Sequence, residues 1–355
     1  MDISVITSTN KKSKPAVDAL GFGRYFTDHL FLMEYNEGKG WHYPIIKPYG
    51  PIELDPAAMV LHYGQAVFEG MKCYRTQDGR FLLFRPWENF KRLNVSDARL
   101  CIPAIDEEFA LEALIELIKI DKDWVPDASG TSLYIRPFVI STESCVGVRP
   151  ANSYNFIIIL SPVGPYYPEG FKPVKIYIED EYVRAVRGGV GFTKAAANYA
   201  VSLKGQTKAY AHGYSQVLWL DGLERKYIEE VGAMNVFFYI GDELITPSLE
   251  GTILPGITRD SIIQLAKKDG LKVIERKISI DELYEAAGNG TLKEAFGSGT
   301  AAVISPIGEF KWGDKVFKVG NGDVGPIANK LYDKLTGLQY GRYADDMGWV
   351  KIVEN

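Results

Sequence analysis

A segment rich in proline and glycine near the middle of the chain limits the fold more than any other feature of the sequence. Residues 164–173 read GPYYPEGFKP, and regular structure is disfavoured there because proline lacks an amide hydrogen and glycine is conformationally permissive. The chain has 355 residues, more than one hydrophobic core usually supports. We therefore predict a smaller N-terminal α/β domain at 1–165, a linker at 166–173 and a larger C-terminal domain at 174–355.

The composition and charge of the chain argue against several functions. The net charge is −5 and no block of lysine and arginine occurs, which is not typical of a general nucleic-acid binder. Residues 1–15 lack the apolar core of a signal peptide, and the apolar run at 156–160 is too short to span a membrane. Three cysteines are too few for a disulfide framework, and four histidines lack the spacing of zinc ligands. The sequence predicts a cytoplasmic protein with no metal site and no nucleic-acid or membrane partner.

Strand-like and helix-like patterns occur in both halves of the chain, which indicates a mixed α+β fold. Turn signals at 37–40 and 78–79 predict two hairpins, and Asp106 is placed to cap a helix. In the first half we expect strands at 31–35, 43–46, 71–75, 81–84, 133–137 and 156–160 and helices at 87–99 and 107–120. In the second half we expect strands at 174–178, 217–220, 231–240 and 303–305, a turn at 296–302, and helices after Lys194, from 254–260 to about 268 and at about 327–335.

A single lysine after a glycine cluster is the most informative chemical signal. Residues 188–194 read GGVGFTK; the glycines allow close backbone packing, and a lysine held there can form a Schiff base with a carbonyl group. Further along, Glu229 and Glu230 lie side by side in a strand pattern, where one side chain can be solvated while the other points inward. An amine and a semi-buried acid suit the aldehyde and the ring nitrogen of pyridoxal phosphate. The alternative interpretation is a surface lysine and two solvent-facing acids.

Three features are suited to binding a phosphate. The amides of Ile257 and Thr258 open a helix after a Pro-Gly pair. Thr300 follows a Gly-Ser-Gly sequence, and Arg92 offers a forked cation. Helix capping, a tight turn and a solvated arginine are the alternative interpretations. Residues 188–194 match neither a P-loop nor a complete dinucleotide fingerprint.

The order and spacing of motifs along nearly the whole chain resemble those of the branched-chain amino acid aminotransferases, which are fold type IV pyridoxal-phosphate enzymes. The resemblance implies a two-domain α+β fold with pyridoxal 5'-phosphate at the domain interface, bound by the C-terminal domain, and a homodimeric assembly. The matching motifs are FGRYFTDH at 22–29, LHYGQAVFEGMK at 61–72, FRPW at 84–87, YIRP at 134–137, GGVGFTKAAANY at 188–199, EVG at 230–232, LPGITR at 254–259 and GSGTAA at 297–302.

The resemblance also implies roles in holding the cofactor. Lys194 resembles the Schiff-base lysine, which moves the proton between substrate and cofactor. Glu230 resembles the partner of the pyridine nitrogen, and Tyr199 resembles the donor to the phenolic oxygen. The residues that resemble phosphate anchors are Arg92, Arg184, Ile257, Thr258 and Thr300.

For the substrate, the resemblance implies an apolar pocket that also accepts a second carboxylate. Arg136 resembles the residue that admits the distal carboxylate of glutamate, and Val148 resembles a loop residue lent by the other subunit. Tyr63, with the backbone of Thr300 and Ala301, resembles the site of the α-carboxylate. The wall of the side-chain pocket is implied to consist of Phe22, Phe68, Tyr134 and Ala233.

The resemblance therefore implies transamination between L-leucine, L-isoleucine or L-valine and 2-oxoglutarate. A D-amino acid aminotransferase, an aminodeoxychorismate lyase of the same fold and a non-catalytic pyridoxal-phosphate binder are the alternatives. The chain departs from the family pattern at two places. Ala302 and Ser305 replace a Cys-x-x-Cys pair that some relatives carry, and Ala233 replaces a threonine. A pocket change of this size shifts substrate preference by about 1–3 kcal/mol.

Overall fold

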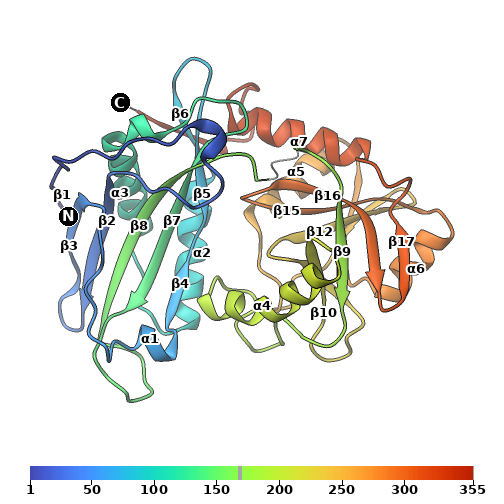
Figure 1. Ribbon diagram of the computed structural model, residues 1–355, viewed down its shortest axis with the longest axis horizontal. Coiled ribbons are helices and arrows are strands. Elements are labelled where there is room, and N and C mark those ends of the chain that lie inside the picture. The colour runs from blue at the N-terminus through green and yellow to red at the C-terminus, as the bar shows by residue number, and fades with distance from the viewer. Residues whose placement is uncertain (167–169, 355) are drawn as a thin grey trace. The chain divides into compact units, whose positions relative to one another are not determined.

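The computed structural model describes residues 1–166 and 170–354 and divides the chain into two compact units (Figure 1). The first unit contains Met1–Pro168, Thr193–Ala197 and Gly337–Asn355, and the second contains Glu169–Phe192 and Asn198–Thr336. Two short pieces of the C-terminal half therefore belong to the first unit. The linker expected at 166–173 includes residues 167–169, which lie outside the described residues.

The first unit contains a largely antiparallel sheet. Among the described residues its strands follow the order β1-β3-β2-β8-β7-β5-β6-β18, and β4 pairs with β7. Only β1 and β3 run parallel within this set. The strands are β1 Ser4–Val5, β2 His29–Asn36, β3 Gly40–Pro48, β4 Ala66–Phe68, β5 Met71–Arg75, β6 Phe81–Phe84, β7 Ser132–Ser141, β8 Ser153–Val163 and β18 Val350–Val353.

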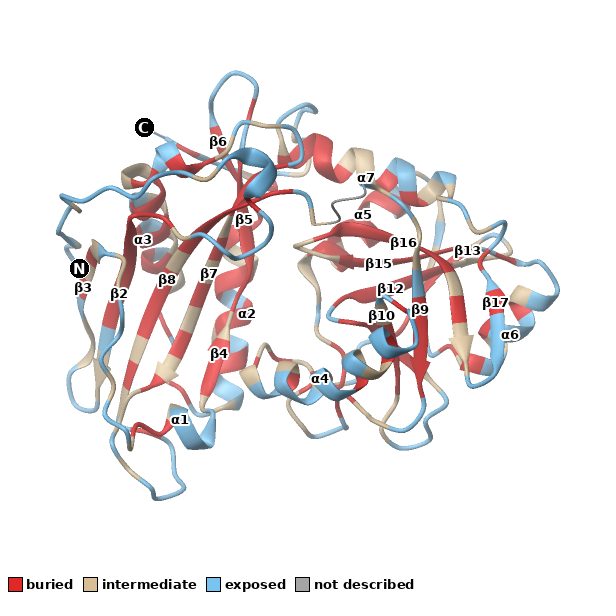
Figure 2. Cartoon of the chain, in the orientation of Figure 1, coloured by how far each residue is buried: buried red, intermediate tan, exposed pale blue. Residues whose placement is uncertain are grey.

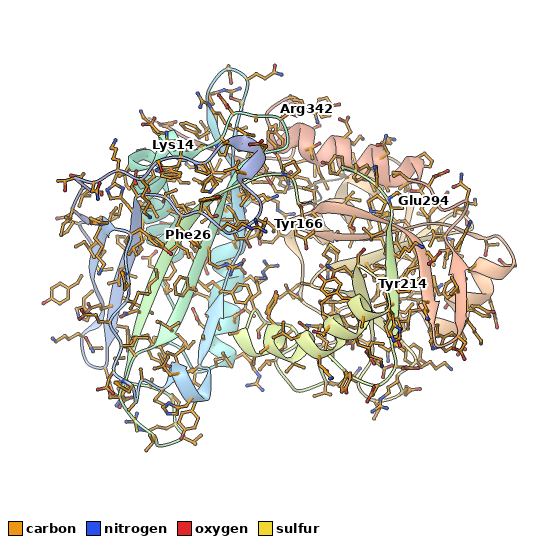
Figure 3. The ribbon with its side chains drawn as sticks, viewed as in Figure 1. Lys14, Phe26, Tyr166, Tyr214, Glu294 and Arg342 are labelled. Atoms are coloured by element: carbon orange, nitrogen blue, oxygen red, sulfur yellow. The ribbon has the colours of Figure 1, made fainter. Side chains whose placement is uncertain are left out.

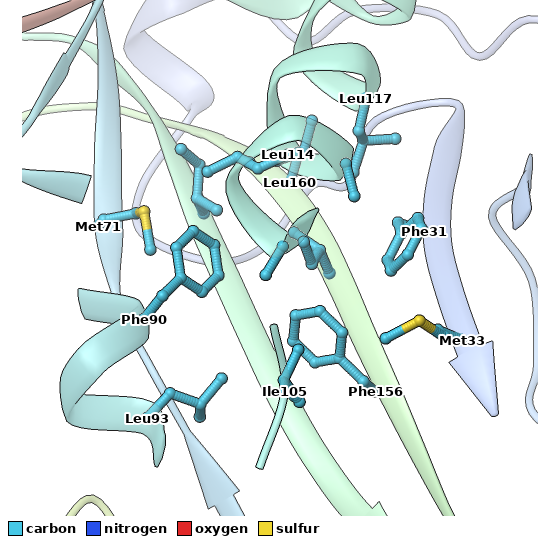
Figure 4. Close-up of a cluster of buried hydrophobic side chains, with 14 of the residues drawn as sticks. Phe31, Met33, Met71, Phe90, Leu93, Ile105, Leu114, Leu117, Phe156 and Leu160 are labelled. Atoms are coloured by element: carbon cyan, nitrogen blue, oxygen red, sulfur yellow. The ribbon is translucent and has the colours of Figure 1, made fainter. Parts of the chain in front are cut away.

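Two amphipathic helices cover one face of this sheet. They are α2 Pro86–Arg99 and α3 Glu107–Ile120; a short helix, α1 Val60–Tyr63, precedes β4. The side chain of Asp106 accepts hydrogen bonds from the amides of Glu108 and Phe109, which fixes the start of α3. Figure 4 shows side chains from both helices packed against β2 and β8. This buried cluster is the core of the unit.

The opposite face of the same sheet is also apolar. Because side chains alternate along a strand, Phe138 and Ile140 of β7 point away from the helix-covered core, as do Ile157 and Ile159 of β8. With Leu30, Leu32, Ile45 and Tyr49 these residues form a second cluster, which we call the outer apolar face. Several of its members are only partly buried in the single chain (Figure 2).

The second unit contains a mixed sheet flanked by helices. Its described strands follow the order β11-β10-β9-β16-β15-β12-β13-β14, with β17 on β16. Glu294 of β15 (Leu292–Gly299) accepts hydrogen bonds from the amides of Ile327 and Ala328 and so fixes the start of α7 (Pro326–Gln339; Figure 3). The strands are β9 Val174–Glu179, β10 Gln216–Leu220, β11 Ile228–Val231, β12 Asn235–Ile240, β13 Glu243–Thr246, β14 Lys272–Glu275, β15 Leu292–Gly299, β16 Val303–Trp312 and β17 Lys315–Lys318. The helices are α4 Ala196–Ala211, α5 Ile257–Lys268, α6 Ile280–Gly288 and α7 Pro326–Gln339.

Most expected elements are confirmed, and two are wrong. The single strand expected at 231–240 is two strands, because the chain turns at Gly232, whose φ is +57°, and the amide of Val231 bonds to the carbonyl of Met234. The turn expected at 296–302 begins later, because residues up to Gly299 continue β15 and pair with β16. Among the described residues, none of the helices combines the length and hydropathy needed to cross a membrane.

Candidate active site

Lys194 is held on the sheet of the first unit just before α4 begins. Its amide donates to the hydroxyl of Ser96, 3.0 Å away on α2, and its carbonyl accepts from the amide of Phe68 at 3.1 Å. Its ammonium group lies 4.6 Å from the centroid of the Phe68 ring. The side chain is half-buried, which argues against a fully solvated surface lysine. Backbone bonds on both sides of Lys194 fix where its side chain begins.

Four of the predicted substrate residues come together beside this lysine. The guanidinium of Arg136 lies 4.6 Å from the Phe68 ring centroid and donates to the hydroxyl of Tyr134 at 3.1 Å. The ring of Phe22 meets that of Tyr134 edge-on at 4.9 Å. Phe68 stands opposite Phe138 in the β4–β7 register, and Tyr134 and Arg136 alternate with the core-facing residues of β7. The group therefore shares its sheet face with the outer apolar face.

Tyr63 lies on the short helix α1, and Val148 lies on the loop after β7. The hydroxyl of Tyr63, on the short helix α1, donates to the carbonyl of Val146. Val146 and Val148 lie on the loop after β7 and are 76% and 85% exposed. Apolar side chains with that exposure gain little hydrophobic stabilisation in the single chain.

Arg92 is engaged by a buried acid that the sequence interpretation missed. Its Nε and Nη2 donate to the carboxylate of Glu69 at 2.8 and 3.0 Å, and Asn89 donates to the same carboxylate at 2.8 Å. Burial raises the pKa of Glu69, but the charge and hydrogen bonds of Arg92, the charge of Lys194 and the hydrogen bond of Asn89 together hold that pKa below its ordinary value. The sequence signal was available, because Glu69 follows Phe68 within a matching motif.

In the second unit, Glu230 is buried and strongly bound. One carboxylate oxygen accepts from the amide of Leu254 at 2.8 Å, and the other lies 3.3 Å from Nε of Arg184. Glu229 is buried as well, with 5% exposure against 4% for Glu230. The expectation that one of these acids is solvated is therefore wrong.

A β-bulge explains why both acids are buried. Leu218 of β10 pairs with Val231 and Leu220 pairs with Ile228, so two residues of β11 stand opposite the single residue Trp219. A bulge of this kind interrupts strict side-chain alternation and redirects one side chain. Burial raises the pKa of Glu229 to about 7, although a side-chain hydrogen bond from Thr252 and the charge of Arg184 lower it.

The start of α5 in the same unit is suited to an anion. Within the part of the chain that the structure describes, no side chain caps this helix, so the first amides, which include those of Ile257 and Thr258, point out of its N-terminus. Asn235 donates to the carbonyl of Leu254 at 2.9 Å and holds the chain that enters the helix. A phosphate group fits this arrangement.

The remaining predicted residues of the second unit lie on turns and on α4. Thr300 and Ala301 are half-buried in the turn between β15 and β16. That turn ends at Val303, whose φ of +61° is strained for a β-branched residue. Tyr199 is half-buried on α4, and Ala233 is exposed in the turn between β11 and β12.

Comparison with known proteins agrees with this chemistry. The family model for class IV amino-transferases matches residues 66–310. The chain belongs to the class IV aminotransferases. This class IV aminotransferase is 59% identical to the branched-chain-amino-acid aminotransferase 2 of Bacillus subtilis (strain 168) over 351 residues, which cover 99% of this chain and 97% of the relative. Within the family it belongs to the branched-chain amino acid aminotransferases, as the motifs predicted.

Solved structures agree with the fold of this aminotransferase. A crystal structure of the Escherichia coli branched-chain amino acid aminotransferase aligns with a TM-score of 0.78 at 29% identity and covers 92% of this chain and 99% of its own. A T.th. branched-chain amino acid aminotransferase, solved with pyridoxamine 5'-phosphate, aligns with a TM-score of 0.73 at 26% identity, covering 91% and 98%. The predicted α+β fold of type IV is confirmed.

Proposed function

We propose that this aminotransferase exchanges amino groups between L-leucine, L-isoleucine or L-valine and 2-oxoglutarate. The observation that carries the proposal is the position of two cations beside one aromatic ring. The ammonium group of Lys194 and the guanidinium of Arg136 each lie 4.6 Å from the Phe68 ring centroid. An apolar side chain can lie against that ring, and a second carboxylate can pair with Arg136.

Pyridoxal 5'-phosphate is the cofactor of this family, and it supplies an aldehyde for the amine and a ring that takes up electrons from the α-carbon. The chain's own residues provide what such a group needs. Lys194 supplies the amine and carries the proton to and from the substrate α-carbon. Glu230 supplies a buried carboxylate for a ring nitrogen, and Tyr199 a donor for a phenolic oxygen. The uncapped start of α5 supports the fit of the phosphate.

We assign the phosphate to the amides of Ile257 and Thr258, with help from Thr300, Arg92 and Arg184. The two arginines act from fixed positions, because Glu69 orients Arg92 and Glu230 orients Arg184. Each arginine is already paired with a carboxylate, so most of its positive charge is neutralised before a phosphate group binds. We therefore expect the helix amides to supply most of the phosphate affinity.

We assign the substrate to residues on the outer side of the first unit's sheet. Phe22, Phe68 and Tyr134 supply apolar surface, and Arg136 receives a distal carboxylate. In the single chain Arg136 rests on Phe68 and Tyr134, so it can return there when the substrate is apolar. Tyr63 and the backbone of Thr300 and Ala301 are assigned to the α-carboxylate.

We also propose a homodimer in which the loop carrying Val148 serves the partner's site. The support is physical: a second copy would cover the partly buried outer apolar face and the exposed valines of that loop. We propose a cytoplasmic location, since Cys73, Cys101 and Cys145 are free thiols.

A substrate panel tests the proposed activity. The protein, loaded with pyridoxal phosphate, should transfer amino groups from L-leucine, L-isoleucine and L-valine to 2-oxoglutarate far faster than from D-alanine. The variant Lys194→Ala, purified in the same way, is the background control. Faster turnover of D-alanine would assign a D-amino acid aminotransferase, and release of pyruvate from aminodeoxychorismate would assign a lyase; either result would overturn the proposal.

A further inference from the structure

We propose that Glu229 is a second acid of the cofactor site: it acts as a positioning residue that holds a proton while the site is empty and releases it when a cation binds at Glu230. The inference rests on the proposed role of Glu230 as partner of the cofactor ring nitrogen. It assigns a function to a buried carboxyl group that the proposed reaction does not use.

The first argument is placement. The β-bulge opposite Trp219 brings Glu229 and Glu230 into the buried interior side by side, where a regular strand would send one of them outward. Bulges often occur beside active sites, where they redirect a side chain. Of the two carboxylate oxygens of Glu229, Oε2 is buried and has no hydrogen-bond partner among the described residues. A bare carboxylate oxygen in that position is costly when it is charged.

The second argument is charge. Arg184 is the cation that favours ionisation of Glu229, while Glu230 and Asp221 oppose it. The guanidinium of Arg184 is already 3.3 Å from Glu230. Two ionised glutamates would therefore lie near Arg184 in a buried position, and protonation of one glutamate brings these three groups to neutrality. Glu229 is that residue, because its pKa is raised to about 7 by burial.

The third argument is connection to the phosphate side of the site. Thr252, which bonds to Glu229, also accepts a hydrogen bond from Arg184 through its carbonyl. Two residues later the amide of Leu254 donates to Glu230. Hydrogen bonds to both acids and to Arg184 thus hold the segment that leads into α5. A change of charge on Glu229 acts on the chain that presents the phosphate-binding amides.

A cation at Glu230 changes this balance. A protonated ring nitrogen there would pair with Glu230 and add one positive charge beside Arg184. Nearby positive charge lowers the pKa of a carboxyl group, so Glu229 would lose its proton and restore neutrality. Loading the site is then coupled to proton release, and the affinity for the cofactor depends on the charge of Glu229.

The first experiment uses the full chain without cofactor, and so does not depend on the proposed function. A carboxyl group whose pKa is higher in the folded state than its ordinary 4.5 destabilises the fold progressively between pH 4.5 and about 7. The midpoint of denaturant unfolding of the native chain should therefore fall relative to Glu229→Gln across this range. Glu229→Asp, which keeps a carboxyl group, should show the same decrease of the midpoint as the native chain. Parallel curves for the native chain and Glu229→Gln would overturn the inference.

The second experiment measures protons released when pyridoxal phosphate is added to the cofactor-free chain, by calorimetry in two buffers of different ionisation enthalpy. At pH 7 the native chain should release up to about half a proton more than Glu229→Gln, because a group whose pKa equals the pH is half protonated. The variant subtracts all other proton changes. Equal release would overturn the inference. Borohydride trapping of the cofactor on Lys194 in both proteins tests the proposed function separately, since it succeeds whatever Glu229 does.

Discussion

Gly191, three residues before Lys194, packs closer to Thr252 than any side chain would allow. A Cβ atom at this position would lie 2.4 Å from the carbonyl oxygen of Thr252 and 2.5 Å from Cβ of Ala185. Both distances are shorter than van der Waals contact, so Gly191→Ala must move the backbone that carries Thr252. We expect a loss of about 1–3 kcal/mol in the free energy of unfolding and weaker cofactor binding.

Gly288→Ala is the matched control, because a Cβ there meets nothing within 4 Å and the φ of the residue is not positive. Denaturant titration of both variants should show the loss only for Gly191→Ala, with Gly288→Ala unchanged or more stable by about 0.4–1 kcal/mol. Equal stability of the two variants would contradict the close packing.

At the scale of residues, the sequence identified the chemical types but not all of their surroundings. The spacing of Lys194 and Glu230 was visible as a pattern, because both residues lie in motifs that resemble those of the family. The burial of Glu229 was not, since it depends on a bulge that becomes visible only when β11 is paired with β10. The pairing of Arg92 with Glu69 joins positions 23 residues apart. The motif that contains Glu69 marks that residue but does not identify its partner.

Secondary structure elements with local signals were predicted most accurately. The helix α3 begins at Glu107 and ends at Ile120, as its spacing indicated, and Asp106 caps it. Replacing Asp106 measures how much this cap contributes to the free energy of unfolding. Asp106→Ala should lower the free energy of unfolding by about 0.5–2 kcal/mol, since two amides of the first turn lose their acceptor.

The control for the cap is Glu112→Ala, an exposed position in the middle of the same helix. Denaturant unfolding should place this variant within about 0.5 kcal/mol of the native chain. If both substitutions had the same effect, the contribution of Asp106 would reflect helix charge in general and not the cap.

The elements that were misjudged depend on pairing between distant segments. The strand expected at 231–240 joined the last residue of β11 to β12, because Val231 and most residues of β12 are apolar. The amide of Gly232 bonds to the carbonyl of Val217, and that contact with a separate strand helps to hold the turn. Similarly, Phe296–Gly299 is strand because it pairs with both β12 and β16. The small residues of this segment favour a turn, but hydrogen bonds to the neighbouring strands hold them in a strand.

At the scale of the whole molecule, the division of the chain into units does not follow the sequence order. The piece Thr193–Ala197 joins the first unit because Ala195 forms a bridge with Val67. The C-terminal strand β18 joins it by pairing with β6. Both contacts close loops of more than one hundred residues, which a composition-based boundary cannot detect. Proline and glycine show where the chain can leave one unit, but they do not show which later segments pair back with that unit.

The proposed dimer makes a prediction about which chain each residue serves. If the loop that carries Val148 completes the partner's site, Val148→Asp should damage the site of the other chain while Lys194→Ala inactivates its own. Val148 is 85% exposed, so the substitution should leave the fold intact. Leu223→Asp, at a position that is 91% exposed on a turn of the second unit, is the control and should keep activity. Sedimentation should give twice the 39.6 kDa mass of one chain.

Mixing the two defective proteins distinguishes a loop that completes the partner's site from a loop that completes the site of its own chain. In a hybrid dimer, one site receives a native Lys194 from the Val148→Asp chain and a native loop from the Lys194→Ala chain. Random exchange of subunits should therefore restore about a quarter of the native activity, since half of the dimers are hybrids and each has one intact site. A loop that served its own chain would leave every site in the mixture with a defect, and activity would stay at the level of the separate variants.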